Sequence, residues 1–226
     1  MHYRQGDSDE DRIAYGEVVL AAIGRVPNTD ADWFRSSGLK LDERGYVTVD
    51  GYGRTNLDGV WALGDITPGH ALAHRAFEQG ITIAEKIDGA DPKPVIDDTV
   101  PQVVFSFPEA ASVGLTLDQA KAREDVVEPK ETAYPMLSNA RMLMSGEGGS
   151  MTVVSGAFAN NPDMQVVLGV HIVSPIASDL IAEAEQLVGN RVPLADAARL
   201  IHPHPTFSET LGEALLKADG RPLHTR

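Results

Sequence analysis

The stretch Ile201-His-Pro-His-Pro-Thr-Phe-Ser-Glu209 is the most informative part of the sequence. Its two prolines fix two φ angles and disfavour helix in the residues that precede them, so His204 is predicted to lie in a stiff, extended segment. A helix is expected to begin just after it, with Thr206 as the N-cap and Glu209 at the capping-box spacing. Glu209 therefore has two candidate partners, the backbone at Thr206 and the imidazole of His204.

A carboxylate that is hydrogen-bonded to one imidazole nitrogen fixes the tautomer of the ring and leaves the other nitrogen free to act as a base. On this interpretation His204 is an acid–base residue that Glu209 orients; on the alternative, Glu209 only caps a helix. His202 and His204 beside a glutamate could mimic a metal site, but Pro203 and the missing third ligand argue against it, and no metal is predicted. His202 is ambiguous, because its backbone could help to form the site while its side chain could lie at the surface.

The sequence before this stretch mixes strand and helix patterns without strict alternation. Such grouping indicates an α+β domain with an antiparallel sheet, and it is expected over residues 98–226. His171 lies on one of the alternating strands and is expected to be packed or solvated and not to be a ligand. The strand candidates are 100–105, 127–134, 151–158 and 166–172, and the helix candidates are 116–123, 176–188, 194–200 and 207–218.

The N-terminal part has a different pattern. The continuous apolar run 15–23 ends at Gly24-Arg-Val-Pro-Asn28 and is typical of a strand buried on both faces, which needs parallel neighbours. Because no βαβ unit precedes it, the run is interpreted as the last strand of a domain whose beginning is missing. Further predictions here are a helix at 30–38, strands at 46–50 and 59–64, an amphipathic helix at 70–88, and a linker at 89–94 with a domain boundary near residue 97.

The composition excludes several classes of protein. A formal charge of −14 argues against nucleic acid and against an anionic membrane surface as partners. The chain has no cysteine, so disulfides and Cys-based zinc sites are excluded. The sequence contains no stretch of about 18 apolar residues, so no membrane span is predicted. Residues 1–11 do not resemble a secretory signal. A cytoplasmic location is expected by default.

The segment His204-Pro-Thr-Phe-Ser-Glu209 resembles the C-terminal active-site signature of the class I pyridine nucleotide–disulfide oxidoreductases. The form with a second histidine two residues earlier is most similar to that of the dihydrolipoamide dehydrogenases. Glutathione reductases carry two consecutive glutamates where this chain has Glu209-Thr210, and the terminal cysteine pair of mercuric reductases is absent. Mycothione reductases have a similar signature and remain an alternative.

Four further segments extend the resemblance over nearly the whole chain. They resemble the end of the family's NAD domain (22–28), its second flavin motif (55–65), the segment under the flavin ring (72–74) and the opening of the dimerisation domain (105–114). The resemblance implies three parts: residues 1–28 as the end of an NAD-binding domain, 29–97 as the C-terminal part of an FAD-binding domain, and 98–226 as the dimerisation domain. The expected fold is therefore α+β, with remnants of α/β domains before an antiparallel sheet.

The resemblance also implies cofactor-binding residues. Asp65, at the end of a predicted strand after Gly64, could accept a hydrogen bond from a ribityl hydroxyl, although Gly-Asp is also common in plain turns. Leu72, Ala73 and His74 lie near the start of a helix, whose free N–H groups favour the negative charge of a reduced flavin. The alternative is an ordinary first turn with a solvated His74 side chain. A further residue of this kind is Gly24, where a nicotinamide dinucleotide could approach the backbone.

The implied reaction is the oxidation of a dihydrolipoyl dithiol by NAD⁺, with FAD as the intermediate carrier. His204 would remove the thiol proton in the active site of a partner subunit, so a homodimer is expected, and a 2-oxoacid dehydrogenase complex is an implied partner. The GxGxxG motif and the cysteine pair of the family are absent, so the chain alone is expected not to turn over. Two alternatives are an inactive stand-alone dimerisation module and an independent metal hydrolase. The disulfide substrate and the choice between NAD and NADP are not determined.

Overall fold

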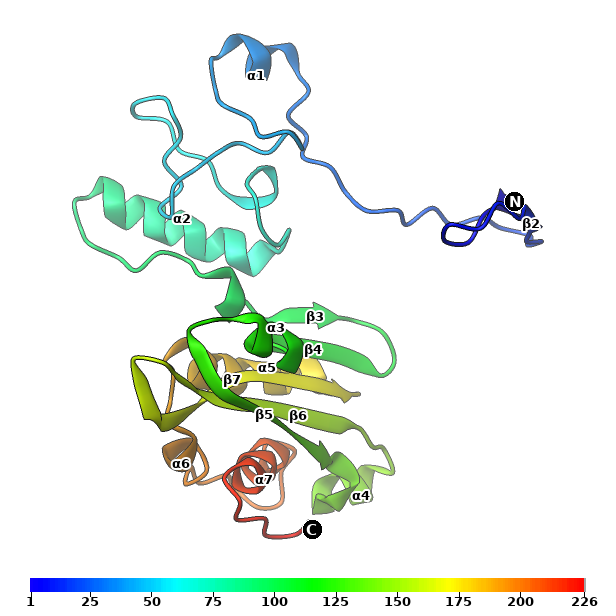
Figure 1. The fold of residues 1–226 in the computed structure, drawn as a ribbon, viewed down its shortest axis with the longest axis vertical. Coiled ribbons are helices and arrows are strands. Elements are labelled where there is room, and N and C mark those ends of the chain that lie inside the picture. The colour runs from blue at the N-terminus through cyan, green and yellow to red at the C-terminus, as the bar shows by residue number, and fades with distance from the viewer. Residues whose placement is uncertain (226) are drawn as a thin grey trace.

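The computed structural model describes residues 1–225, and its C-terminal part is built on a five-stranded antiparallel sheet (Figure 1). The strands follow the order β3-β4-β7-β6-β5 across this sheet, while β1 and β2 form a separate pair near the N-terminus. The strands are β1 (His2–Tyr3), β2 (Arg12–Ile13), β3 (Gln102–Val104), β4 (Glu109–Gly114), β5 (Val126–Pro135), β6 (Ser150–Phe158) and β7 (Asn161–Ser174).

Seven helices and three short 3-10 turns complete the described residues. The helices are α1 (Asp32–Ser36), α2 (Ala73–Ile87), α3 (Leu117–Ala122), α4 (Ala140–Ser145), α5 (Ala177–Gly189), α6 (Leu194–Ala197) and α7 (Glu209–Ala218). The 3-10 turns are η1 (Gly64–Ile66), η2 (Asp97–Thr99) and η3 (Met136–Ser138). None of the helices within residues 1–225 is long and apolar enough to cross a bilayer.

Successive side chains of each strand point to opposite faces of the sheet. Val153 and Val170 point to the face that α5 and α7 cover and belong to the largest buried cluster of the molecule. Val154 and Val166 point to the other face, where they pack with Ala120 of α3. The hairpin of β6 and β7 forms the centre of the sheet, with Val153 opposite Val170. The predicted α+β class with an antiparallel sheet is confirmed.

The C-terminal prediction identified four of the five strands and four helices, with shifts of a few residues. It missed β4 because the sequence Glu-Ala-Ala-Ser-Val-Gly holds small residues with weak strand preference. It also missed α4, which is too short for helical periodicity to show and begins at an Asn139 side-chain cap. The helix predicted at 194–200 ends earlier, at Ala197.

The three strands predicted before residue 97 are wrong. The run 15–23 forms no strand within the described residues, and its side chains are exposed; Leu20 is 87% and Ile23 98% exposed. Residues 46–50 and 59–64 contribute only the isolated bridges Leu41–Val47 and Arg54–Trp61. A strand buried in a sheet requires continuous hydrogen-bonded neighbours, and among the described residues this part of the chain provides only isolated bridges. The two helices predicted here are confirmed as α1 and α2.

Candidate active-site pair and cofactor-facing residues

His204 and Glu209 form a hydrogen-bonded pair just before and at the start of α7. The Nδ1 atom of His204 lies 2.8 Å from Oε1 of Glu209, and the second oxygen, Oε2, accepts from the backbone N–H of Thr206 at 2.8 Å. An ionised carboxylate only accepts, so Nδ1 of His204 is the donor. The Nε2 atom is then left without a proton on a side chain that is 70% exposed. Glu209 therefore bonds both of its candidate partners, one with each carboxylate oxygen.

The surroundings of Glu209 keep its carboxylate ionised. Burial raises the pKa of Glu209, but the hydrogen bonds from the Thr206 backbone and from His204 outweigh it, so that the pKa is lowered overall. A carboxylate that is ionised at neutral pH can hold one tautomer of the imidazole in place. The pair thus has the geometry of a base and its orienting partner.

The prediction of Thr206 as the helix N-cap is wrong. The N-cap of α7 is Ser208, whose side chain makes no cap hydrogen bond. The Thr206 hydroxyl instead donates to the carbonyl oxygen of Pro203 at 2.7 Å, which ties the turn before the helix. Only the half of the capping box in which Glu209 reaches back to the Thr206 N–H is present.

His202 is buried, with its side chain only 10% exposed, and its Nε2 lies 2.8 Å from Oε1 of Glu183 on α5. This answers the open question from the sequence, since the side chain is packed inside and not at the surface. The hydrogen bond that His202 donates to Glu183 raises the pKa of His202 against the opposing effect of burial. Glu183 was not predicted, because no local pattern relates it to a histidine 19 residues away.

His171, the histidine of the five-stranded sheet, is partly buried. His171 on β7 places its Nε2 3.2 Å from the carbonyl oxygen of Leu115. Within residues 1–225, no group of three or more His, Cys, Asp or Glu side chains lies close enough together to hold a metal ion.

Gly64, Asp65 and the start of α2 lie on two elements that contact each other, η1 and α2. Gly64 is buried with a φ of +72°, a conformation that favours glycine, and its N–H donates to Oε1 of Gln79 at 2.8 Å. The carboxylate of Asp65 is exposed beside it. Leu72 precedes the first turn of α2, where no side chain of the described residues caps the helix. An acceptor for hydroxyl groups and a positive helix end are therefore available together.

These residues fit one wall of a flavin site. Asp65 would hold a ribityl hydroxyl, and the N–H groups at Ala73 and His74 would face the edge that becomes negative on reduction. The His74 side chain is exposed, as expected, and its Nε2 also lies 2.6 Å from the carbonyl oxygen of Pro101. Gly24, with a φ of +109°, lies in the exposed segment, and no atom of the described residues lies within 4 Å of its added Cβ position.

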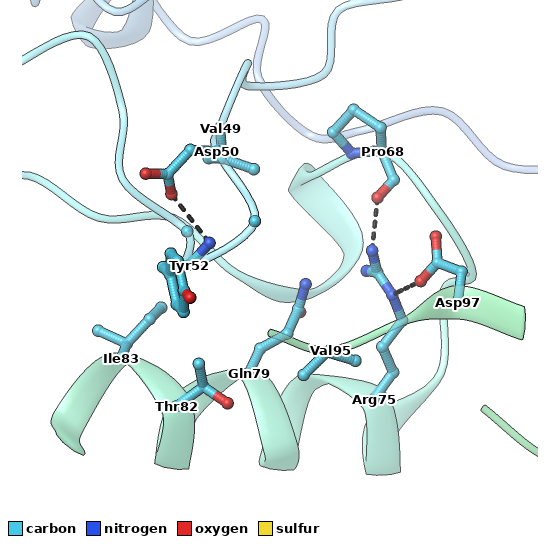
Figure 2. A pocket seen from close by; sticks show the side chains of 12 residues that line it. Val49, Asp50, Tyr52, Pro68, Arg75, Gln79, Thr82, Ile83, Val95 and Asp97 are labelled. Atoms are coloured by element: carbon cyan, nitrogen blue, oxygen red, sulfur yellow. Dashed lines mark hydrogen bonds and ion pairs between the residues drawn. The ribbon is translucent and has the colours of Figure 1, made fainter. Parts of the chain in front are cut away.

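Behind α2 lies a cavity of about 270 Å³ that none of the predicted cofactor-binding residues lines (Figure 2). Figure 2 shows Arg75 pointing from α2 toward Pro68 and Asp97. Its Nε donates to Oδ1 of Asp97 at 2.6 Å, and a second nitrogen donates to the carbonyl oxygen of Pro68 at 2.6 Å. Arg75 is buried, so this ion pair holds α2 to the segment that enters the sheet.

The predicted acid–base pair and the predicted cofactor-binding residues do not meet within one chain. Figure 1 shows α2 on one side of the sheet and α7 at the far end of the molecule. His204 and Glu209, at the start of α7, therefore lie away from Gly64, Asp65 and the first turn of α2.

Two family models match the chain. The dimerisation domain of the family described as "Pyridine nucleotide-disulphide oxidoreductase" matches residues 100–215, and a second model of that description matches residues 3–80. The dihydrolipoyl dehydrogenase of Cupriavidus necator is 40% identical over 208 residues, which are 91% of this chain and 42% of that protein. The dihydrolipoyl dehydrogenase of Bacillus subtilis is 35% identical over 222 residues, 97% of this chain and 45% of that protein.

The solved structures agree with the sequence comparison. LpdA from Mycobacterium tuberculosis has a TM-score of 0.78 and 31% identity over 87% of this chain and 42% of that one. The chain thus spans less than half the length of the curated relatives that it matches. The predicted similarity to dihydrolipoamide dehydrogenases is confirmed. The chain belongs to the pyridine nucleotide–disulphide oxidoreductase family, whose members, dihydrolipoyl dehydrogenase among them, are oxidoreductases that use FAD and NAD(H).

Proposed function

We propose that this chain is the C-terminal portion of an FAD-dependent oxidoreductase that oxidises dihydrolipoyl dithiols with NAD⁺. It contributes the acid–base pair His204–Glu209 and the surface through which two copies form a homodimer. The observation that carries the proposal is the 2.8 Å contact between Nδ1 of His204 and Oε1 of Glu209, which leaves Nε2 free on an exposed ring.

His204 and Glu209 act on protons. A thiol must lose its proton to become the reactive thiolate, and the free Nε2 of His204 takes it. Glu209 holds the tautomer and stabilises the imidazolium that forms, while its second oxygen stays bonded to the Thr206 N–H. FAD, when bound, supplies the two-electron chemistry between the dithiol and the nicotinamide. Gly64, Asp65 and the first turn of α2 would hold its ribityl chain and ring edge, and a nicotinamide dinucleotide would approach the backbone at Gly24.

A homodimer follows from the separation of the two groups of residues. Because α7 lies far from α2 in one chain, His204 serves the flavin-facing residues of the second copy. Val104, Phe105 and Phe107, at and after the end of β3, are exposed apolar side chains that a second copy can cover. Sedimentation should give a dimer, and a species that stays monomeric at high concentration would contradict this part. A 2-oxoacid dehydrogenase complex is the proposed larger assembly, since the relatives named dihydrolipoyl dehydrogenase act on dihydrolipoyl groups.

The proposal can be tested in a chimera in which this chain replaces the matching region of the Cupriavidus necator relative. We expect oxidation of dihydrolipoamide with NAD⁺, and a loss of about 10²–10⁴-fold in kcat for His204→Gln, because the proton-transfer residue is removed. Glu209→Gln should cost less, because the base remains but its tautomer is no longer held. The matched control is His171→Gln, which should keep the activity. An active chimera that is indifferent to His204→Gln would refute the assignment.

Two alternatives have specific support. The signature also fits a mycothione reductase-like enzyme, which a higher rate with a mycothione-type disulfide than with dihydrolipoamide would favour. The second alternative is a dimerisation module without activity, because the five-stranded sheet and the helices α5 to α7 share one buried core. A chimera that dimerises and binds FAD but never turns over would favour it.

A further inference from the structure

A second histidine–glutamate pair lies directly beside the first and belongs to no proposed chemistry so far. His202 and His204 are two residues apart, and each bonds a glutamate from a different helix at 2.8 Å: Glu183 of α5 and Glu209 of α7. His202 is buried where His204 is exposed. The two pairs therefore have different surroundings, although they share one short segment.

The ring of His202 also packs against α7. A Cβ added at Gly212 would lie 2.5 Å from Nδ1 of His202 and 2.9 Å from its Cε1, closer than side-chain atoms pack. Glycine in a helix interior costs about 0.5–1 kcal/mol relative to alanine, so its presence here needs a reason. The close approach of the imidazole supplies that reason. His202 thus contacts α5 through Glu183 and α7 through Gly212, one helical turn after Glu209.

We propose that His202 and Glu183 form a positioning pair that holds the segment 202–204 against α7 and so aligns His204 with Glu209. The inference rests on the proposed role of His204 and Glu209 as the acid–base pair. His202 itself does not touch substrate. Its ring joins two helices that cover the same face of the sheet, and the backbone of Pro203 carries the constraint to His204. When it is protonated, His202 also helps to lower the pKa of Glu209.

The tautomer of His204 reports on this alignment without any turnover. When Nδ1 donates to Glu209, the ring is held as the Nδ1–H form, whereas a free imidazole prefers the Nε2–H form. Long-range ¹⁵N–¹H spectra of the 226-residue chain at mildly alkaline pH distinguish the two. We expect Glu183→Ala to shift His204 from mostly Nδ1–H toward the Nε2–H form. Glu183→Gln should restore the Nδ1–H form, because its amide oxygen accepts from Nε2 of His202.

Gly212→Ala tests the same idea from the other helix, since its methyl group would displace the His202 ring. The matched control is Glu185→Ala, which changes a carboxylate on α5 that makes no hydrogen bond to a histidine in the described residues. Thermal unfolding of each variant verifies that it is folded. A His204 tautomer that is unchanged in a folded Glu183→Ala variant would overturn the proposal. Should Glu209→Gln leave the tautomer of His204 unchanged, the acid–base pair itself would be refuted, which is a separate failure.

Discussion

The run 15–23 and the strand stretch 166–172 are both continuous and apolar in the sequence, yet they have opposite fates in the structure. Val170, in the middle of β7, is fully buried between β4 and β6, whereas Leu20 and Ile23 are almost fully exposed. The difference lies in the neighbours. β7 has a hydrogen-bonded strand on each side and helices over one face, and the run 15–23 has neither within the described residues. An apolar run predicts burial only where the chain also supplies the elements that bury it.

The largest contrast is expected in the exchange of backbone amides. No backbone hydrogen bond of the described residues involves the amides of 15–23, so they should exchange at the rate of an unstructured peptide. Those of β7 at 166–172 should exchange slower by at least about 10³-fold, since they open only with the sheet. Hydrogen–deuterium exchange followed by mass spectrometry of peptides measures both. Protection of 15–23 in the isolated chain would contradict the comparison.

Truncating one leucine in each region should sharpen the same contrast. Leu211 of α7 is fully buried in the main cluster, so Leu211→Ala should lower the free energy of unfolding by about 2–5 kcal/mol. Leu20→Ala, in the exposed run, should change it by less than about 0.5 kcal/mol. The midpoints of urea denaturation, followed by circular dichroism, compare the two variants. Equal losses would show that the run 15–23 is packed in solution.

A smaller effect is expected at the ion pair between Arg75 of α2 and Asp97, which precedes the sheet. Asp97→Ala removes the carboxylate from Arg75, which is buried and keeps only Pro68 and the weaker contact to Thr67. We expect the free energy needed to open α2 to fall by about 1–3 kcal/mol, because a buried donor is left unsatisfied. Exchange of the amides of α2 in low concentrations of urea measures it. The control is Asp91→Ala, which removes a carboxylate that is 91% exposed from Lys86; a similar loss there would argue that burial of Arg75 is unimportant.

The success of the sequence-based predictions also depends on whether a segment has its packing partners within the described residues. The C-terminal elements were predicted because their partners lie in the same chain, so the periodicity of β6, β7 and α5 reports real packing. The strand at 15–23 failed because its apolar run reports a burial that residues 1–225 do not provide. Residues 46–50 and 59–64 do bury Val47 and Ala62, but they make only isolated bridges and no strand ladder. In the site, His204 and Glu209 were found because they lie only five positions apart in one stiff segment. Glu183 and Gly212 were not, because their contact with His202 exists only once α5 and α7 pack on the sheet.

The smallest expected effect is the pH dependence of the C-terminal domain that arises from His202. The hydrogen bond to Glu183 raises the pKa of His202 in the folded state, so the folded state binds this proton more tightly than the unfolded chain. The stabilisation is therefore fully present below the unfolded pKa of about 6.5 and is lost as the pH rises through the raised folded value.

Glu183→Gln keeps a hydrogen-bond acceptor but removes the negative charge that favours the imidazolium, and it should flatten this part of the pH dependence. The difference between the wild type and the variant stays below about 1 kcal/mol, because the side chain of Glu183 is 37% exposed and solvent screens the pair. Urea midpoints of both proteins at about pH 6 and pH 8.5, on either side of the unfolded pKa, give the difference directly, and the other titrating groups cancel in it. A wild type that loses no more stability than the variant between these pH values would mean that Glu183 does not hold the His202 imidazolium. The positioning role of this pair would then rest on the packing against Gly212 alone.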